Sequence, residues 1–370
     1  MSDSRRILCF EYLQLSDEMF REASASLRSE AGAMLKAILT DALRLQNTEV
    51  FTILGHAVSH PMQEADLPGR LTTIRISEVA DINRYLQTHG NRFTDVFAIA
   101  PECDGVLTDL LARMHSSLPD TVRIHNVPVE LSRCFSDKLS TTQWCNEHRL
   151  PCIPASPCSR RIADLLRDRF LTGTPSSRSE RPAGAVLKPR YGAGSQDVCR
   201  LSCEWDELSR LISDTDDAVP EDQDWIVQPW IAGISCSVGF LGNVSQECPA
   251  VVLPPVRQQI RDISGRLQYT GGELRIPDPG LDAAERLAVR FGEVVGPFAG
   301  YLGIDMIAST DSFDSEAVIV EINPRLCTSY VGYQTLCTAS LFAAMVATET
   351  HHRELAWRRH VHRFAPGTDP

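Results

Sequence analysis

What the sequence lacks narrows its function first. The 370-residue chain has no uninterrupted apolar run near the roughly 18 to 20 residues that span a bilayer. Its opening residues, MSDSRRILCF, lack the apolar core of a secretion signal. It also lacks an excess of positive charge, because its net charge is -12. These absences argue against a membrane surface or a nucleic acid as the main partner. We therefore expect a cytoplasmic protein that acts on small molecules.

Clustered cysteines are missing as well. The 12 cysteines are scattered, and the closest pair, Cys199 and Cys203, has no neighbouring His or Cys partner. We therefore expect reduced thiols rather than a structural zinc site or a disulfide framework. The stretch HHRELAWRRHVHRF near the end leaves metal binding by its histidines open, although a solvated, charged helix face is the favoured interpretation.

Two nucleotide-binding fingerprints are also absent. No glycine cluster follows the first β-rich segment, RILCFEYL, and the Walker spacing GxxxxGK[ST] does not occur. The composition, with 43% hydrophobic and 23% charged residues, is that of an ordinary soluble globular protein. A chain of this length exceeds what one hydrophobic core usually serves, so we expect more than one structural unit.

Strand-like and helix-like segments alternate over the first 125 residues. The strands are expected at RILCFEYL, VFTILG, TTIRI and DVFAIA, and helices at SEAGAMLKAILTDALRL and CDGVLTDLLARM. Such alternation predicts an α/β fold with a parallel, doubly wound sheet, which is a Rossmann-like unit.

The rest of the chain reads as further α/β structure. Helices are expected at SDKLSTTQWCNEH, RIADLLRDRF, AAERLAVRFGEVV and LCTASLFAAMVAT, and strands at AVLKP and DWIVQPWI. The aperiodic stretch TGTPSSRSERPA, residues 172 to 183, predicts a mobile loop. We divide the chain into residues 1–125, 126–230, 231–350 and a charged tail, 351–370.

A carboxylate pair is the most informative feature. YLGIDMIAS and AVIVEIN are two strands joined by the polar segment STDSFDSE. A symmetric hairpin centred on Phe313 places Asp305 directly opposite Glu321. Because strand residues two apart share a face, Asn323 lies beside Glu321, and Val320 lies on the other face.

Like charges directly opposite on a sheet are destabilising, so a positive charge is expected between them. Two carboxylates with an amide oxygen form a hard-oxygen set that suits Mg²⁺. Two alternatives remain open: the acidic side chains face water, or Arg325, which follows in EINPR, neutralises Glu321.

A second group of residues could meet phosphate. LKPRYGAGSQDV places Lys188 at a strand end and then supplies Gly192, Gly194 and Ser195, whose backbone N–H groups can converge on an anion. An ordinary glycine-rich hairpin with a solvated lysine has the same pattern. In WIVQPWIAGIS the strand stops at Pro229, which leaves the following backbone groups free to meet a heterocycle edge, or simply marks an ordinary strand end.

Taken in order, these segments resemble the ATP-grasp superfamily over roughly residues 126 to 345. The resemblance implies a Rossmann-like unit followed by a two-subdomain ATP-grasp fold. It also implies ATP and Mg²⁺, which Mn²⁺ can replace, as cofactors. The most specific portion is VEINPR after LGIDMI.

The resemblance assigns roles residue by residue. The residues that would contact ATP are Lys138, Lys188, Gly192, Gly194, Ser195, Gln228, Trp230, Ile231 and Ser235, the last at a position where many members carry a ribose-binding glutamate. The Mg²⁺ ligands would be Asp305, Glu321 and Asn323, and Arg325 would face the transferred phosphoryl group. Gly303 lies where D-alanine:D-alanine ligases have an arginine, so another cation must serve, and Arg275 is the candidate. The predicted catalytic set is therefore Lys188, Arg325 and Arg275.

A narrower resemblance points to a subgroup that includes tyramine-glutamate ligase of methanofuran biosynthesis. The segments that carry it are SEAGAMLKAILTDAL, APECDGVLTDLL, LPPVRQQI with YTGGELRIP, and EINPRLCTSYVGY. It implies an ADP-forming ligase that joins a small-molecule carboxylate to an amine through an acyl phosphate. Dimers are the commonest assembly of cytoplasmic enzymes, so a homodimer is the expected assembly. The alternatives are another ATP-grasp chemistry, such as carboxylation, and a nucleotide-binding protein without catalysis.

Overall fold

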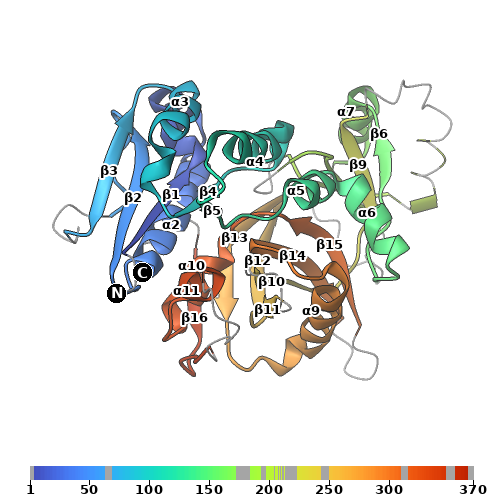
Figure 1. Ribbon diagram of the computed structural model, residues 1–370. Helices are drawn as coiled ribbons and strands as arrows, with labels where there is room; N and C mark the ends of the chain where they lie inside the picture. The colour runs from blue at the N-terminus through green and yellow to red at the C-terminus, as the bar shows by residue number, and fades with distance from the viewer. Residues whose placement is uncertain are drawn as a thin grey trace.

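The computed structural model describes residues 4–62, 69–171, 184–192, 197–203, 223–242, 250–309, 316–346 and 355–365, with single positions between 205 and 212. The loop predicted at 172–183 lies outside these residues, as do Gly194 and Ser195. Two sheets organise the described chain, and Figure 1 shows a separate lobe around α6 and α7 (Lys138–Glu147 and Arg160–Phe170).

The first sheet is parallel, with the strand order β3-β2-β1-β4-β5. This confirms the predicted doubly wound unit. Its strands are β1 (Arg5–Glu11), β2 (Thr48–Gly55), β3 (Leu71–Ile76), β4 (Asp95–Ile99) and β5 (Arg123–Ile124). Its helices are α1 (Asp17–Glu22), α2 (Ala25–Ala42), α3 (Ala80–His89) and α4 (Val106–Ser117), with short 3-10 turns η1 (Tyr12–Leu15), η3 (Gly90–Arg92) and η4 (Cys103–Gly105).

Both faces of this sheet are covered. In β1, Leu8 and Phe10 join the core that includes α3 and α4, whereas Ile7 and Cys9 join the core that includes α2. Successive strand residues point to opposite faces, so an unbroken apolar run is what a strand buried on both sides requires.

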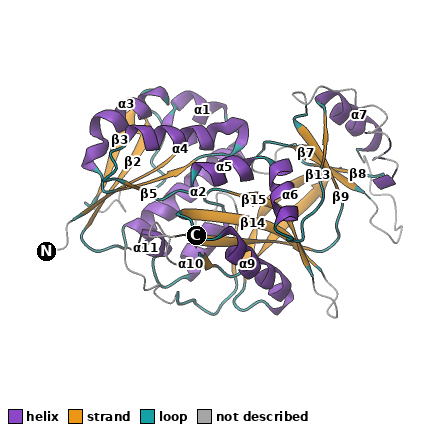
Figure 2. Ribbon diagram, turned by 45° about the vertical axis from the view of Figure 1, so that its right-hand side comes forward, coloured by secondary structure: helices purple, strands orange, loops and turns teal. Residues whose placement is uncertain are grey.

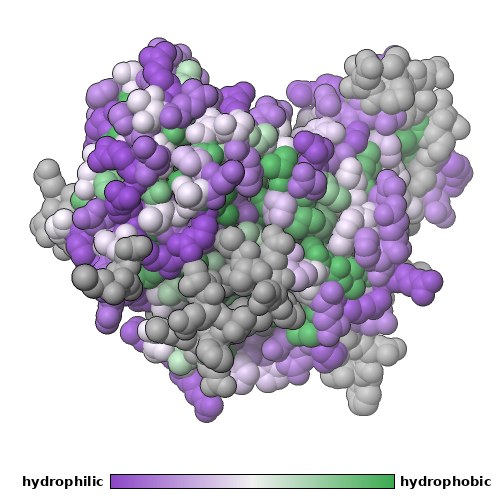
Figure 3. Space-filling model, in the orientation of Figure 1, coloured by the Kyte–Doolittle hydropathy of each residue, from purple (hydrophilic) through white to green (hydrophobic). Residues whose placement is uncertain are grey.

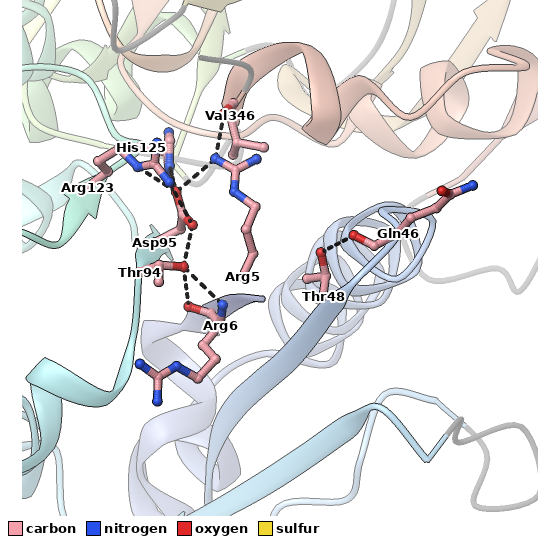
Figure 4. Close-up of polar contacts among 9 residues, drawn as sticks. All are labelled: Arg5, Arg6, Gln46, Thr48, Thr94, Asp95, Arg123, His125 and Val346. Atoms are coloured by element: carbon pink, nitrogen blue, oxygen red, sulfur yellow. Dashed lines mark hydrogen bonds and ion pairs between the residues drawn. The ribbon is translucent and has the colours of Figure 1, made fainter. Parts of the chain in front are cut away.

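A buried ion-pair cluster marks the amino-terminal end of β4 (Figure 4). Asp95 is fully buried and accepts hydrogen bonds from His125 Nε2 at 2.7 Å, Thr94 Oγ1 at 2.6 Å and Arg5 Nη2 at 3.2 Å. Burial opposes ionisation, but these partners lower the pKa of Asp95 to about 2. Arg5 also donates to the carbonyl of Val346 at 2.7 Å, which ties the first unit to the end of a C-terminal helix.

Over the described residues, the second sheet has eleven strands and runs β15-β14-β10-β12-β13-β8-β7-β9-β6, with β11 paired to β10 and β16 to β13. The lobe contributes β6 (Ser156–Cys158), β7 (Ala185–Pro189), β8 (Cys199–Leu201) and β9 (Trp225–Pro229). The body contributes β10 (Ile234–Gly242), β11 (Val251–Val252), β12 (Val256–Ile263), β13 (Arg266–Leu274), β14 (Gly300–Ala308), β15 (Ala317–Asn323) and β16 (His362–Phe364). One pair, Arg266 opposite Cys199, joins the body to the lobe.

Helices flank this sheet. They are α5 (Val129–Ser136), α6 and α7 near the lobe, the turn η6 (Pro279–Leu281), α9 (Asp282–Val295), α10 (Ser329–Leu336) and α11 (Leu341–Val346). Figure 2 shows α9 against the sheet of β14 and β15, and Phe291 of α9 packs in the same core as Leu302 and Ile304 of β14. No helix of the described chain combines the length and apolar character needed to cross a membrane.

Two expectations for the C-terminal region are wrong. The segment LCTASLFAAMVAT does not form one helix, because α10 ends at Leu336 and α11 begins at Leu341. The histidine-bearing stretch contains no helix within residues 355–365; instead β16 pairs with β13, with Phe364 opposite Gly272. An apolar Phe364 that is 8% exposed explains the preference for an edge strand over a solvated helix.

Candidate active site

The hairpin of β14 and β15 confirms the predicted register. Asp305 is opposite Glu321, and Gly303 is opposite Asn323. A bulge follows, because Met306 pairs with Ile319 and leaves Val320 without a partner in the ladder. Val320 was predicted to lie on the face opposite Glu321; the bulge instead brings both side chains to the same cavity.

Lys188 neutralises Glu321. Its Nζ lies 3.0 Å from Glu321 Oε2, and the lysine side chain is only 5% exposed. Burial opposes ionisation of Glu321, but Lys188 and Lys138 lower the pKa of this carboxyl to about 2. The positive charge expected between the carboxylates is therefore supplied in part by the end of β7.

Asp305 has neutral partners instead. Its Oδ1 accepts from Gln258 Nε2 at 2.7 Å and its Oδ2 from Asn323 Nδ2 at 3.1 Å. Ser235 Oγ donates to Gln258 Oε1 at 2.8 Å, which fixes the orientation of that amide. Burial and the facing charge of Glu321 raise the pKa of Asp305 to about 7. Thus Asp305 is a carboxyl without a cation among its described hydrogen-bond partners.

This donor set fits a divalent cation. Two carboxylates and an amide provide the oxygen atoms that Mg²⁺ prefers. Burial and the charge of Glu321 raise the pKa of Asp305, so a cation at this position would stabilise the ionised carboxylate. Within the described chain, no group of three or more His, Cys, Asp or Glu side chains is arranged to hold a metal. A cation bound by Asp305 and Glu321 would therefore need Asn323 and water or phosphate oxygens to complete its ligands.

Arg325 is held by the first unit rather than by Glu321. Its Nε and Nη2 donate to the two carboxylate oxygens of Glu102, the latter at 3.0 Å, and its Nη1 donates to the carbonyl of Leu326 at 3.1 Å. The alternative in which Arg325 pairs directly with Glu321 is therefore wrong. One N–H remains on each terminal nitrogen, and we call these two remaining donors the arginine fork; guanidinium N–H groups suit a carboxylate or phosphate.

Glu102 was missed by sequence reasoning, although a signal was present. It follows the carboxyl end of β4, and the strand order reverses between β1 and β4. Ligands of open α/β sheets bind at such a switch point. Glu11 ends β1 at the same place; its two oxygens accept the N–H groups of Leu13 and Gln14, each at 3.1 Å, and burial raises its pKa to about 7.

Lys138 opens α6 and reaches across to the end of β7. Its Nζ donates to the carbonyl of Gly192 at 2.9 Å, at the edge of the predicted phosphate loop. Burial lowers the pKa of Lys138, and Glu321 opposes that effect. Asp137 caps the helix by accepting from Leu139 N–H at 2.9 Å and is clamped by Arg190 at 2.8 and 2.6 Å, so the position of Lys138 is fixed.

The predicted adenine segment is partly as expected. Gln228 is buried and its Nε2 donates to the carbonyl of Ile153 at 3.4 Å. The backbone N–H of Trp230 was predicted to be free, but it donates to the carbonyl of Gly184 at 2.9 Å. The N–H of Ile231 has no partner among the described residues and is the group that remains available to a base edge.

One cavity of about 740 Å³ collects these residues. Figure 3 shows hydrophobic residues exposed in the middle of the visible face, between α4 and α6. The predicted residues that line the cavity are Lys138, Lys188, Gly192, Gln228, Trp230, Ile231, Ser235, Asp305, Glu321, Asn323 and Arg325.

Arg275 is not brought together with the others. Its exposed side chain lies 3.3 Å from Glu273 and does not line the cavity. Arg200 and Arg257 do line it. Gly303 leaves no room for an arginine, because a Cβ there would lie 2.5 Å from Cys327 Sγ.

Comparison with known proteins decides the family. A family model of the ATP-grasp domain matches residues 135–329, which is more than half of the chain. The chain belongs to the ATP-grasp family. This ATP-grasp protein matches no curated protein in sequence.

Solved structures share the ATP-grasp fold. A protein from Archaeoglobus fulgidus assigned to the ATP-grasp superfamily has a TM-score of 0.60 and 19% identity, covering 92% of this chain and 88% of that one. N5-carboxyaminoimidazole synthase from Aspergillus clavatus, solved with ADP and 5-aminoimidazole ribonucleotide, has a TM-score of 0.58 and 14% identity, covering 93% and 76%. The corresponding ribonucleotide synthetase from Thermotoga maritima has a TM-score of 0.53 and 14% identity, covering 92% and 74%. These likenesses confirm the predicted fold.

Proposed function

We propose that this ATP-grasp protein is an ADP-forming ligase that joins a carboxylate to an amine. The observation that carries the proposal is the single cavity that gathers two buried lysines, a carboxylate pair and an arginine fork. Phosphoryl transfer to an anion chiefly requires positioning and neutralisation of charge, and this cavity supplies both.

In the proposed reaction, an oxygen of the substrate carboxylate attacks the γ-phosphorus of ATP, and ADP leaves. The amine nitrogen then bonds to the carbonyl carbon of the acyl phosphate, and inorganic phosphate leaves. Lys138 and Lys188 would neutralise the phosphates, and Gly192, Gly194 and Ser195 are proposed to contact the phosphates as well. The fork of Arg325 would bind the transferred group, and the cavity-lining Arg257 would assist in place of the predicted Arg275, which does not line the cavity.

The nucleotide would lie with its base near Gln228, Trp230 and Ile231. Ser235, whose hydroxyl is committed to Gln258, would support the metal side rather than the ribose. Asp305, Glu321 and Asn323 would hold Mg²⁺ or Mn²⁺. Bound there, the cation would shield the charge of the triphosphate.

The proposed substrates are glutamate and an arylalkylamine such as tyramine, on the strength of the sequence resemblance to tyramine-glutamate ligase. The test is ADP release from ATP and Mg²⁺ in the presence of glutamate, the amine, both or neither. Release that requires both supports the proposal. Release that requires bicarbonate in place of glutamate would establish carboxylation instead, and tight ATP binding with no ADP release under any mixture would establish a non-catalytic nucleotide-binding protein.

A further inference from the structure

The cavity extends beyond the groups that would hold ATP. On the side of the first unit it is lined by Glu30 of α2, Tyr269 of β13, and Thr328 and Ser329 at the start of α10. Glu30, Tyr269 and Arg325 line the same cavity, and the charge of Glu30 acts electrostatically on both Arg325 and Tyr269. This end of the cavity therefore adjoins the arginine fork where the activated carboxylate would lie.

Glu30 and Asp305 differ from the other acidic groups around the cavity, because neither has an ion pair with a described residue. Glu102 is held by Arg325 and Glu321 by Lys188. Glu273 accepts from Arg363 at 2.7 Å and Asp262 lies 3.6 Å from Arg200, while Asp305 accepts from two amides. Glu30 has one hydrogen-bond partner among the described residues, the hydroxyl of Ser26 at 3.2 Å, and no ion pair with a described residue.

Charge balance at this end favours a cationic ligand. Glu102 binds Arg325 through two hydrogen bonds, so Arg325 acts on Glu30 only at longer range, and no cation of the described chain pairs with Glu30 directly. Burial raises the pKa of Glu30, and the opposing effects of the Ser26 hydroxyl and of Arg325 do not fully offset the desolvation of the carboxylate. Tyr269 adds an aromatic ring, and aromatic rings attract cations and pack against flat apolar groups.

We infer that Glu30 binds the ammonium group of the amine substrate and that Tyr269 packs beside its body. This assignment rests on the proposed ligase function and deepens it by naming the residues that select the amine. It places the nitrogen in the part of the cavity that Arg325 also lines. The ammonium must first give one proton to the Glu30 carboxylate or to water, and the free amine then bonds to the carbonyl carbon of the acyl phosphate as phosphate leaves. The expected substrate class is a primary amine that is protonated at neutral pH, with a ring or other apolar body.

The experiment compares Glu30→Gln with wild type in two reactions of the full-length protein with ATP, Mg²⁺ and glutamate. In the first, tyramine is the acceptor. In the second, hydroxylamine, which is uncharged near neutral pH, traps the acyl phosphate as a hydroxamate and needs no ammonium site. Glu49→Gln, which alters an exposed carboxylate on β2, is the control.

Loss of a hydrogen bond to a charged group should raise the KM for tyramine about 10- to 100-fold in Glu30→Gln. Hydroxamate formation and the KM for ATP should stay within about twofold of wild type, and Glu30→Asp should recover part of the tyramine affinity. An unchanged tyramine KM would overturn the inference, as would an equal loss in both reactions. Absence of hydroxamate with the wild-type protein would instead overturn the proposed function.

Discussion

Asp305→Asn should stabilise the folded protein above neutral pH, and it should also abolish the reaction. Burial and Glu321 raise the pKa of Asp305 from 3.8 to about 7. Between about pH 4 and pH 7 the unfolded chain has released a proton that the folded protein retains, so the free energy of unfolding decreases as pH rises through this window. Asp305→Asn removes the titrating group and with it this decrease.

The size of the effect follows from the same numbers. At about 1.4 kcal/mol per pH unit, a pKa moved from 3.8 to about 7 corresponds to about 4 kcal/mol at high pH. Two features reduce this value. Asp305 is partly exposed, which weakens the electrostatic effect. An asparagine accepts one amide hydrogen bond where the carboxylate accepts two, and the second bond forms again only after the Asn323 amide rotates to present its oxygen. We therefore expect a net gain of about 1 to 2 kcal/mol at about pH 8 and no gain at about pH 4.

Urea unfolding of wild type and Asp305→Asn at these two pH values measures the difference directly. Asp120→Asn, a change at an exposed carboxylate, is the control. A second measurement is the rise in melting temperature that Mg²⁺ adds to that from ADP alone, which should be present in wild type and absent from Asp305→Asn. Equal pH dependence of the two proteins would refute the argument from the raised pKa, and an equal Mg²⁺ effect would remove Asp305 from the metal site.

Three further changes test other parts of the site. Glu321→Ala should lower amide synthesis at least about 100-fold with an unchanged circular dichroism spectrum, and wild-type turnover would remove Glu321 from the mechanism. Burial raises the pKa of Asp137, but the ion pair with Arg190 and the other hydrogen bonds of this carboxylate together lower it by more. Asp137→Asn should therefore lower the free energy of unfolding by about 1 to 3 kcal/mol at neutral pH, and by progressively less as pH falls through the usual aspartate range. A loss that stays constant with pH in urea titrations would contradict this. Gly303→Ala should lower the free energy of unfolding by about 1 to 3 kcal/mol, because the added Cβ would lie 2.5 Å from Cys327 Sγ. Adding Cys327→Ala should restore part of the melting temperature. If it does not, this contact is not the cause of the loss.

The parts of the site that sequence could predict are those set by local geometry. The pairing of Asp305 with Glu321 follows from a symmetric loop centred on Phe313, and the structure has that pairing. The alternation of faces failed at Val320, because a bulge inserts one residue into β15 and no turn signal marks it. Thus the register was predictable at the carboxylates and not beyond them.

The parts that could not be predicted depend on long-range contacts. Arg325 and Glu102 are 223 residues apart in the chain, and no spacing rule connects them. The same holds for Gln258, whose amide reaches Asp305 from a different strand. Trp230 was expected to be free because its strand stops at Pro229, but Gly184 lies close enough to accept its N–H. Partners chosen by tertiary packing decide which predicted groups remain available to a ligand.

The single strand pair between β13 and β8 bears on how nucleotides are exchanged. Among the described residues, this junction consists of two backbone hydrogen bonds, from Arg200 to Gly265 at 2.6 Å and from Leu267 to Val198 at 3.0 Å, with a nearby ion pair of Arg200. At about 1 kcal/mol each, these bonds contribute only about 2 kcal/mol, and the ion pair of Lys188 with Glu321 is a further contact that must break when the lobe moves away. We expect the lobe to swing outward through this weak point, so that ADP can depart while every other strand of the sheet stays paired.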